Sequence, residues 1–227
     1  MDIKARLAQL ADEKYRLFSA ALLPGVSTPL LGVRMPALRQ LAKELVRRYG
    51  EEALLHLTQD SLEEIMLQGI IIGLLKGTPQ EAFKRAETFI PRINCWSVCD
   101  CFCAGFTTAR THPQETWEFL QPYFKDKREY FFRTAVVTGL FHFAKPPYAA
   151  RLIQRLKTPP TQAFYAQMAV AWALAELAVS IPHEVLTFLQ QNTLDKFTHN
   201  KAIQKMRESF RVPPEVKEAA RSLRRPR

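Results

Sequence analysis

The sequence predicts an all-α protein, built as an α-solenoid of antiparallel helical hairpins. Apolar residues recur at spacings of three and four along almost the whole chain, which is the period of one helix face. Alternating strand patterns are absent, and only 8 of the 227 residues are glycine. The 15 prolines interrupt the apolar pattern and leave helix-sized segments between them.

The N-terminal stretch MDIKARLAQLADEKYRLF places charges within a helical apolar pattern, so it predicts a helix and lacks the apolar core of a secretory signal. The longest strongly apolar run, residues 70–75, is far shorter than the roughly 20 residues of a membrane-spanning helix. We therefore expect a soluble, intracellular protein. Helices are predicted at residues 2–22, 36–49, 51–57, 61–76, 79–90, 94–110, 113–124, 127–144, 147–156, 160–179, 182–191, 194–209 and 213–223.

From about residue 79 the helices follow a rhythm in which a short amphipathic helix, a turn and a longer apolar helix recur. The longer helices carry Trp96, Arg133 and Trp172, which are 37 and then 39 residues apart. This period is typical of HEAT and armadillo repeats, whose equivalent positions stack along one face of a superhelix. The sequence thus predicts a single domain over residues 1–227 with one concave groove, and a basic tail, about 221–227, in which disorder would be harmless.

The formal net charge of +10 is high for a compact domain and indicates a polyanionic partner, with nucleic acid as the first candidate. The alternative is a chain that is merely basic, because the tail RSLRRPR alone carries several of the arginines.

The stretch NCWSVCDCFC, residues 94–103, holds all four cysteines. Its spacing lacks the separated cysteine or histidine pairs of a structural zinc site, so zinc and redox roles are the less favoured alternatives. On a helix, Cys95, Cys99 and Cys103 share one stripe, which we expect to pack into the core as small apolar side chains.

Trp96 and Asp100 are four residues apart and share a second stripe of the same helix, rotated away from the cysteines. A tryptophan with a carboxylate one turn away offers a π face and an anion to one ligand. The alternative is a tryptophan that fills a gap between helices beside an aspartate on the rim. Trp172 and Glu176 repeat the same spacing.

Arg133 is a lone cation in the apolar segment YFFRTAVVTGLF. Burying an unpaired charge costs on the order of several kcal/mol. This side chain therefore requires either a partner or a groove. Glu129, one turn earlier, is the ordinary ion-pair alternative.

Several segments together resemble the AlkD-like family of DNA alkylation repair glycosylases, which are built from HEAT-like repeats. The resemblance covers most of the chain and rests on GVRMPALRQLAKEL, NCWSVCD, FFRTAVV, MAVAWALAE and FTHNKAIQKMRES, in that order. Two positions depart from the family pattern: Ser97 stands where many members have an acid, and Ala175 stands where many have arginine.

The resemblance implies a monofunctional hydrolase that excises cationic N3- and N7-alkylated purines from double-stranded DNA, without a deep base-flipping pocket. It makes Asp100, Trp96 and Trp172 the catalytic candidates and Arg133 the phosphate contact. Asp100 would stabilise the oxocarbenium-like sugar and activate water, and the tryptophans would add cation–π contacts. No metal or cofactor is implied, and we expect a monomer that works in the bacterial cytoplasm on the nucleoid, away from membranes.

Further basic residues are candidates for contacts with the DNA backbone, and together they predict salt-sensitive binding. They are Arg34, Arg39, Lys127, Arg128, Lys201, Lys205 and Arg207.

Two other functions fit parts of the pattern. A non-catalytic HEAT-repeat protein that binds damaged or distorted DNA would use the same cleft and the same charge. A helical scaffold for protein partners would explain the repeats, but it would leave Trp96, Asp100 and Arg133 without a common role.

Overall fold

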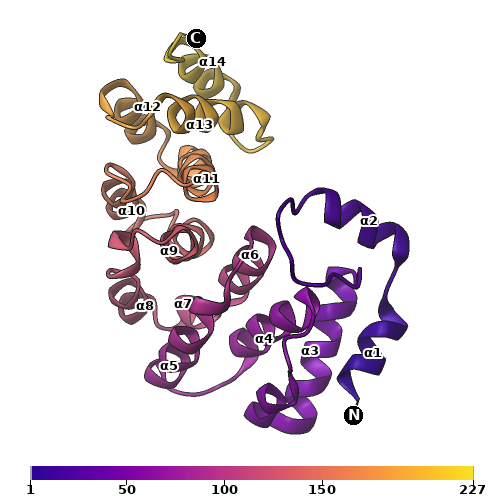
Figure 1. Cartoon of the computed structure of the whole chain (residues 1–227). Coiled ribbons are helices and arrows are strands. Elements are labelled where there is room, and N and C mark those ends of the chain that lie inside the picture. The colour runs from indigo at the N-terminus through magenta and orange to yellow at the C-terminus, as the bar shows by residue number, and fades with distance from the viewer. Residues whose placement is uncertain (1, 227) are drawn as a thin grey trace. The chain divides into compact units, whose positions relative to one another are not determined.

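A computed structural model describes residues 2–226 and confirms the all-α prediction (Figure 1). Within these residues the only β-pairing is an isolated bridge between Ala11 and Val33. The contacts divide the chain into two compact units, Met1–Thr116 and Trp117–Arg227. The superhelix and the single domain expected from the repeat spacing stay predictions.

Unit 1 begins with two short helices, α1 (Ile3–Leu10) and α2 (Glu13–Ala21), where the sequence predicts one helix over residues 2–22. The helix breaks because Ala11 is extended, pairs with Val33, and is followed by Asp12, whose side chain caps α2 by accepting from the Tyr15 N–H. The pairing partner lies 22 residues away, so the local apolar pattern does not reveal the break.

The core of unit 1 is formed by α3 (Met35–Tyr49), α4 (Leu62–Leu74) and α6 (Trp96–Gly105), with α5 (Pro79–Phe89) against α4. Helices α4 and α6 approach so closely that a Cβ added at Gly73 would lie 2.2 Å from the Gly105 carbonyl oxygen. Thr107, after α6, donates to the Gly73 carbonyl oxygen at 2.7 Å. The expected helix over residues 94–110 is therefore two helices, α6 and the one-turn α7 (Thr108–Thr111).

Unit 2 consists of helical hairpins in two layers (Figure 1). We call α9 (Glu129–His142), α11 (Phe164–Ser180) and α13 (Lys196–Glu208) the long layer, and α10 (Ala149–Leu156) and α12 (Pro182–Gln191) the short layer. The last helix, α14 (Pro214–Ser222), packs against α13 and α12. The alternation of short and long helices that the sequence predicts is present here. Alanines along α11 let α9 and α13 pack closely on its two sides.

The remaining segments are short. Residues Gly50–His56 and Tyr123–Lys125 form 3-10 helices where α-helical turns were expected, and α8 covers Pro113–Phe119. The C-terminal residues lie against unit 2: Arg225 donates to the carbonyl oxygens of Leu194 and Asn192. Arg225 thus ties the basic tail to Leu194 and Asn192, and Arg227 lies outside the described residues.

Candidate functional site

The cysteine stripe of α6 faces the core, which confirms the prediction for these side chains. Cys95, Cys99 and Cys103 are all buried, and the Sγ atoms of the last two lie 3.9 Å apart without a disulfide. Among residues 2–226 no group of three or more His, Cys, Asp or Glu side chains is arranged to hold a metal ion.

Trp96 is the first residue of α6 and is half-buried beneath α2. Its indole Nε1 donates to the Leu22 carbonyl oxygen at 3.1 Å, at the carboxyl end of α2. The ring also lines a cavity of about 230 Å³ with Tyr15, Phe18 and Met66. The predicted tryptophan therefore lies against the end of α2 in its own unit.

Asp100 is half-buried one turn after Trp96, as the four-residue spacing predicts. Burial raises the pKa of the neighbouring Cys101 thiol to about 12, while the Arg39 charge lowers it and the Asp100 charge raises it. Arg39 on α3 and Asp100 on α6 thus lie near the same thiol. One predicted DNA contact and the predicted catalytic carboxylate thus both act electrostatically on Cys101.

The segment Leu31–Val33, which contains the start of the GVR motif, is held by a buried carboxylate that the sequence analysis missed. Glu63 of α4 accepts backbone N–H bonds from Leu31, Gly32 and Val33 at 3.0, 2.7 and 3.2 Å. Gly32 has φ of +86°, and a Cβ there would lie 2.5 Å from the Asp12 carbonyl oxygen. The glycine of the motif is therefore a backbone requirement, and three successive N–H groups form an anion nest for Glu63.

Arg34, a predicted DNA contact, joins α2 to α3. It donates to Asp12 at 2.8 Å, and its guanidinium lies 4.9 Å from the centre of the Tyr15 ring. The pKa of Asp12 is lowered, first by the backbone N–H of Tyr15 and then by Arg34. The charge of Arg34 is therefore partly neutralised within unit 1.

Arg133 in unit 2 is only 4% exposed. Its Nη1 donates to the Tyr165 carbonyl oxygen at 2.7 Å, and Glu129 accepts from the Tyr165 N–H at 2.6 Å. Two side chains of α9 thus hold the backbone of one residue at the start of α11. The buried guanidinium has a backbone partner, which the sequence did not identify.

Trp172 of α11 is half-buried and meets Phe141 of α9 edge to face, with ring centroids 5.5 Å apart. Glu176, one turn later, forms an ion pair with Arg211. The contact with Phe141 was missed because no local pattern links residues on different helices.

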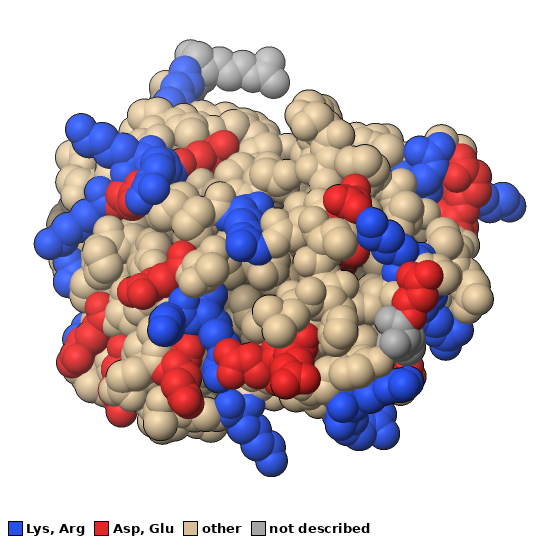
Figure 2. All heavy atoms as spheres, turned by 60° about the horizontal axis from the view of Figure 1, so that its bottom comes forward, with Lys and Arg blue, Asp and Glu red and all other residues tan. Residues whose placement is uncertain are grey.

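The other predicted basic residues lie on the surface of unit 2 in varied surroundings. Arg128 pairs with Asp126 at 2.6 Å and lies 3.4 Å from the Phe131 ring centre. Lys127 and Arg207 are exposed, whereas Lys201 and Lys205 are half-buried on α13. On the face drawn in Figure 2, basic and acidic side chains are interspersed.

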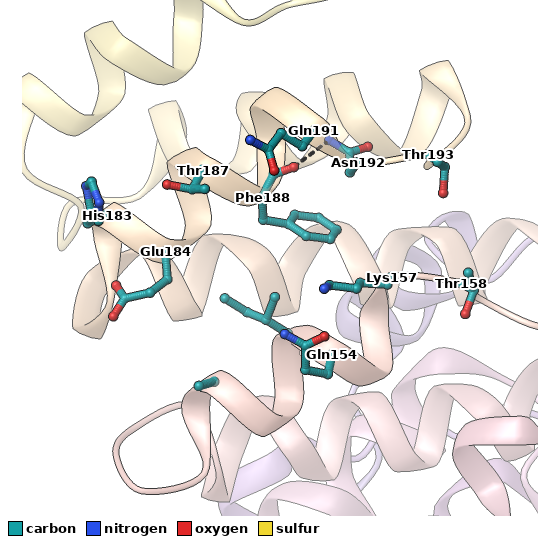
Figure 3. A pocket seen from close by; sticks show the side chains of 12 residues that line it. Gln154, Lys157, Thr158, His183, Glu184, Thr187, Phe188, Gln191, Asn192 and Thr193 are labelled. Atoms are coloured by element: carbon teal, nitrogen blue, oxygen red, sulfur yellow. Dashed lines mark hydrogen bonds between the residues drawn. The ribbon is translucent and has the colours of Figure 1, made fainter.

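A second cavity, of about 580 Å³, lies between α10 and α12 in unit 2 (Figure 3). Phe188 points into it, with Gln154 and Lys157 on the facing helix, and Glu184 lies at its edge. None of the site residues predicted from the sequence lines this cavity. No helix within residues 2–226 is long and apolar enough to cross a lipid bilayer.

Comparison with known proteins connects this geometry to a family. A search of curated proteins found no match. A family model described as DNA alkylation repair enzyme matches residues 3–206, which is most of the chain and includes every site residue predicted from the sequence except Arg207. A role in DNA alkylation repair follows from this match, and the chain belongs to the DNA alkylation repair enzyme family.

Proposed function

We propose that the protein is a monofunctional DNA glycosylase that hydrolyses the N-glycosidic bond of cationic N3- or N7-alkylated purines in duplex DNA. The observation that carries this proposal is the position of Asp100. The carboxylate is half-buried on α6, one turn after Trp96, in a chain of the DNA alkylation repair family. A partly buried carboxylate suits the stabilisation of positive charge on a sugar.

The chemistry requires little help at the base. An alkylated purine already carries positive charge, so the electrons of the C1′–N bond leave with it and yield a neutral base. The deoxyribose gains oxocarbenium character as that bond breaks, and a fixed carboxylate stabilises it. Water then attacks C1′, and Asp100 accepts the proton that the water loses.

The remaining candidates would hold the DNA. Trp96 and Trp172 would contact the lesion nucleotide, where each cation–π contact contributes roughly 0.5 to 2 kcal/mol. Arg133 would bind a phosphate next to the lesion, and the cations at Arg34, Arg39, Lys127, Arg128, Lys201, Lys205 and Arg207 would follow the backbone. The assignment of residues from both units to one DNA molecule rests on the repeat spacing and the family.

A non-catalytic protein that binds damaged DNA is the second candidate, because exposed cations could bind the DNA backbone while two residues proposed to act at the lesion are partly or largely covered. Arg133 is 4% exposed and already donates to the Tyr165 carbonyl oxygen, so a phosphate would have to reach a largely covered side chain. Trp96 is covered in part as well, because its Nε1 is bonded to Leu22.

Release of free base from duplex DNA that carries 7-methylguanine or 3-methyladenine separates the two functions. The glycosylase proposal predicts time-dependent release of free base by the wild-type protein. Salt-sensitive binding to the same duplex without release would establish the binding protein instead. If the protein neither binds nor releases, both proposals are wrong.

A further inference from the structure

Four aromatic rings form a continuous row at the amino ends of the long-layer helices. Tyr130 of α9 lies 6.1 Å from Tyr165 of α11, Tyr165 lies 5.1 Å from Phe164, and Phe164 lies 5.7 Å from Phe197 of α13, measured between ring centroids. We call these four residues the aromatic row. All of them belong to unit 2.

The backbone beneath the row is held on both sides. Glu129 and Arg133 of α9 bind the N–H and the carbonyl oxygen of Tyr165. Asp195 caps α13 by accepting from the Thr198 N–H at 2.9 Å. The row is therefore fixed before any ligand arrives, which lowers the entropic cost of binding.

The rings are exposed to an extent that core packing does not explain. Phe164 is 54% exposed and Phe197 is 41% exposed, while Tyr130 and Tyr165 are half-buried. By contrast, the ring of Phe132, the next aromatic but one along α9 from Tyr130, is fully buried. The row thus offers aromatic surface that remains available to a ligand.

Several cations lie in the segments that carry the row. Lys127 and Arg128 precede α9, Lys196 is adjacent to Phe197, and Lys201 follows one turn later on α13. Asp126 pairs with Arg128 and offsets its charge, and the Glu129 and Asp195 carboxylates accept hydrogen bonds from backbone N–H groups. Lys127, Lys196 and Lys201 are therefore the cations offered to a phosphate. The amino ends of three helices add partial positive charge.

We propose that the aromatic row binds unpaired nucleotides of a DNA strand. Bases in a duplex stack on each other and do not present their faces to side chains, whereas bases of a single strand stack on aromatic rings beside cations that contact the phosphates. The inference adds single-stranded DNA to the duplex of the proposed function, and it does not depend on base excision.

Fluorescence anisotropy with unmodified oligonucleotides tests the proposal. The probes are a labelled oligothymidylate and an abasic strand of the same length, which keeps the phosphates but lacks the bases. We expect the wild-type protein to bind the oligothymidylate more tightly. Phe164→Ala and Phe197→Ala should each weaken that binding by roughly 5- to 100-fold and leave binding to the abasic strand unchanged.

Phe210→Ala is the matched control, since Phe210 is fully exposed in the same unit and outside the row. This variant should retain the preference for bases. Equal binding of both strands by the wild-type protein would overturn the proposal. This comparison uses the wild-type protein alone, so it remains valid even if a substitution impairs folding. No binding to either strand would overturn it too and would favour a protein partner. Base release from methylated duplex, measured separately, reports on the proposed function alone.

Discussion

The helices that carry the two tryptophans of the predicted site, α6 with Trp96 and α11 with Trp172, are supported in different ways. Trp96 on α6 is anchored by one hydrogen bond to Leu22 and borders a cavity beneath α2, a helix in which none of the nine residues is buried. Trp172 lies on α11, where nine of seventeen residues are buried, and rests against Phe141. Segments with few buried apolar contacts open at low free-energy cost. Helix α2, which lies next to Trp96, is thus loosely held, whereas α11, which carries Trp172, is rigidly packed.

The packing of α11 depends most on Arg133, which binds the backbone of Tyr165 at the start of that helix. Arg133→Ala removes the donor to the Tyr165 carbonyl oxygen and leaves space in a buried region, so it should lower the free energy of unfolding by about 3 kcal/mol. Urea unfolding followed by circular dichroism measures the change. Arg128→Ala, at an exposed position, should move the midpoint little. Equal midpoints for the two variants would show that Arg133 does not support α11.

On the loosely held side, Gly32→Ala should have the next largest effect. The new Cβ would meet the Asp12 backbone, and together with the positive φ this should cost about 2 kcal/mol. Gly25→Ala is the control, because Gly25 also has positive φ but a Cβ added there would have no neighbour within 4 Å. In thermal unfolding, the Gly32→Ala protein should have a lower melting temperature than the Gly25→Ala protein. The reverse order would contradict the close contact between Gly32 and Asp12.

Trp96→Phe sharpens the comparison further. It keeps an apolar ring but removes the donor to Leu22, which should cost about 1 kcal/mol and should loosen α2 selectively. Hydrogen exchange should be faster in residues 13–22, with no change in α11. Trp172→Phe, which retains an aromatic ring near Phe141, should leave exchange in α2 as in the wild-type protein. If hydrogen exchange in α2 of the Trp96→Phe protein is no faster than in the wild-type protein, the bond from Trp96 to Leu22 does not anchor α2.

The smallest effect concerns pH and the end of unit 2. Burial lowers the pKa of His199, although its bond to the Leu223 carbonyl oxygen acts in the opposite direction. The unfolded chain therefore takes up a proton more readily than the folded one, so stability is present above the ordinary histidine pKa and falls as pH decreases below about 6.5. Urea unfolding from pH 7.5 to pH 5 should show this loss, and His199→Gln should reduce it. An identical pH profile for both proteins would contradict this assignment.

The sequence predicts those features that depend on local periodicity. The inward stripe of Cys95, Cys99 and Cys103 follows from the 3.6-residue period, and so does the half-buried stripe of Trp96 and Asp100. The alternation of short and long helices in unit 2 also follows from the apolar pattern and the prolines.

Features that depend on distant partners could not be predicted. The break at Ala11 requires Val33, and the environment of Arg133 requires a backbone carbonyl 32 residues later. His199 is buried and bonded to the Leu223 carbonyl oxygen, 24 residues later in the chain. The aromatic row could not be predicted because its rings come from three helices, and no single helix carries a sequence pattern that indicates the row.

The most direct test of the account is single-turnover release of 7-methylguanine from duplex DNA by the Asp100→Asn protein. This change removes the charge and keeps the shape, so the rate should fall by roughly 100-fold or more while the affinity for the duplex remains within a few-fold of the wild-type value. Glu87→Gln, at an exposed position on α5, should retain the wild-type rate. If Asp100→Asn releases the base as fast as the wild-type protein, Asp100 is not the catalytic carboxylate.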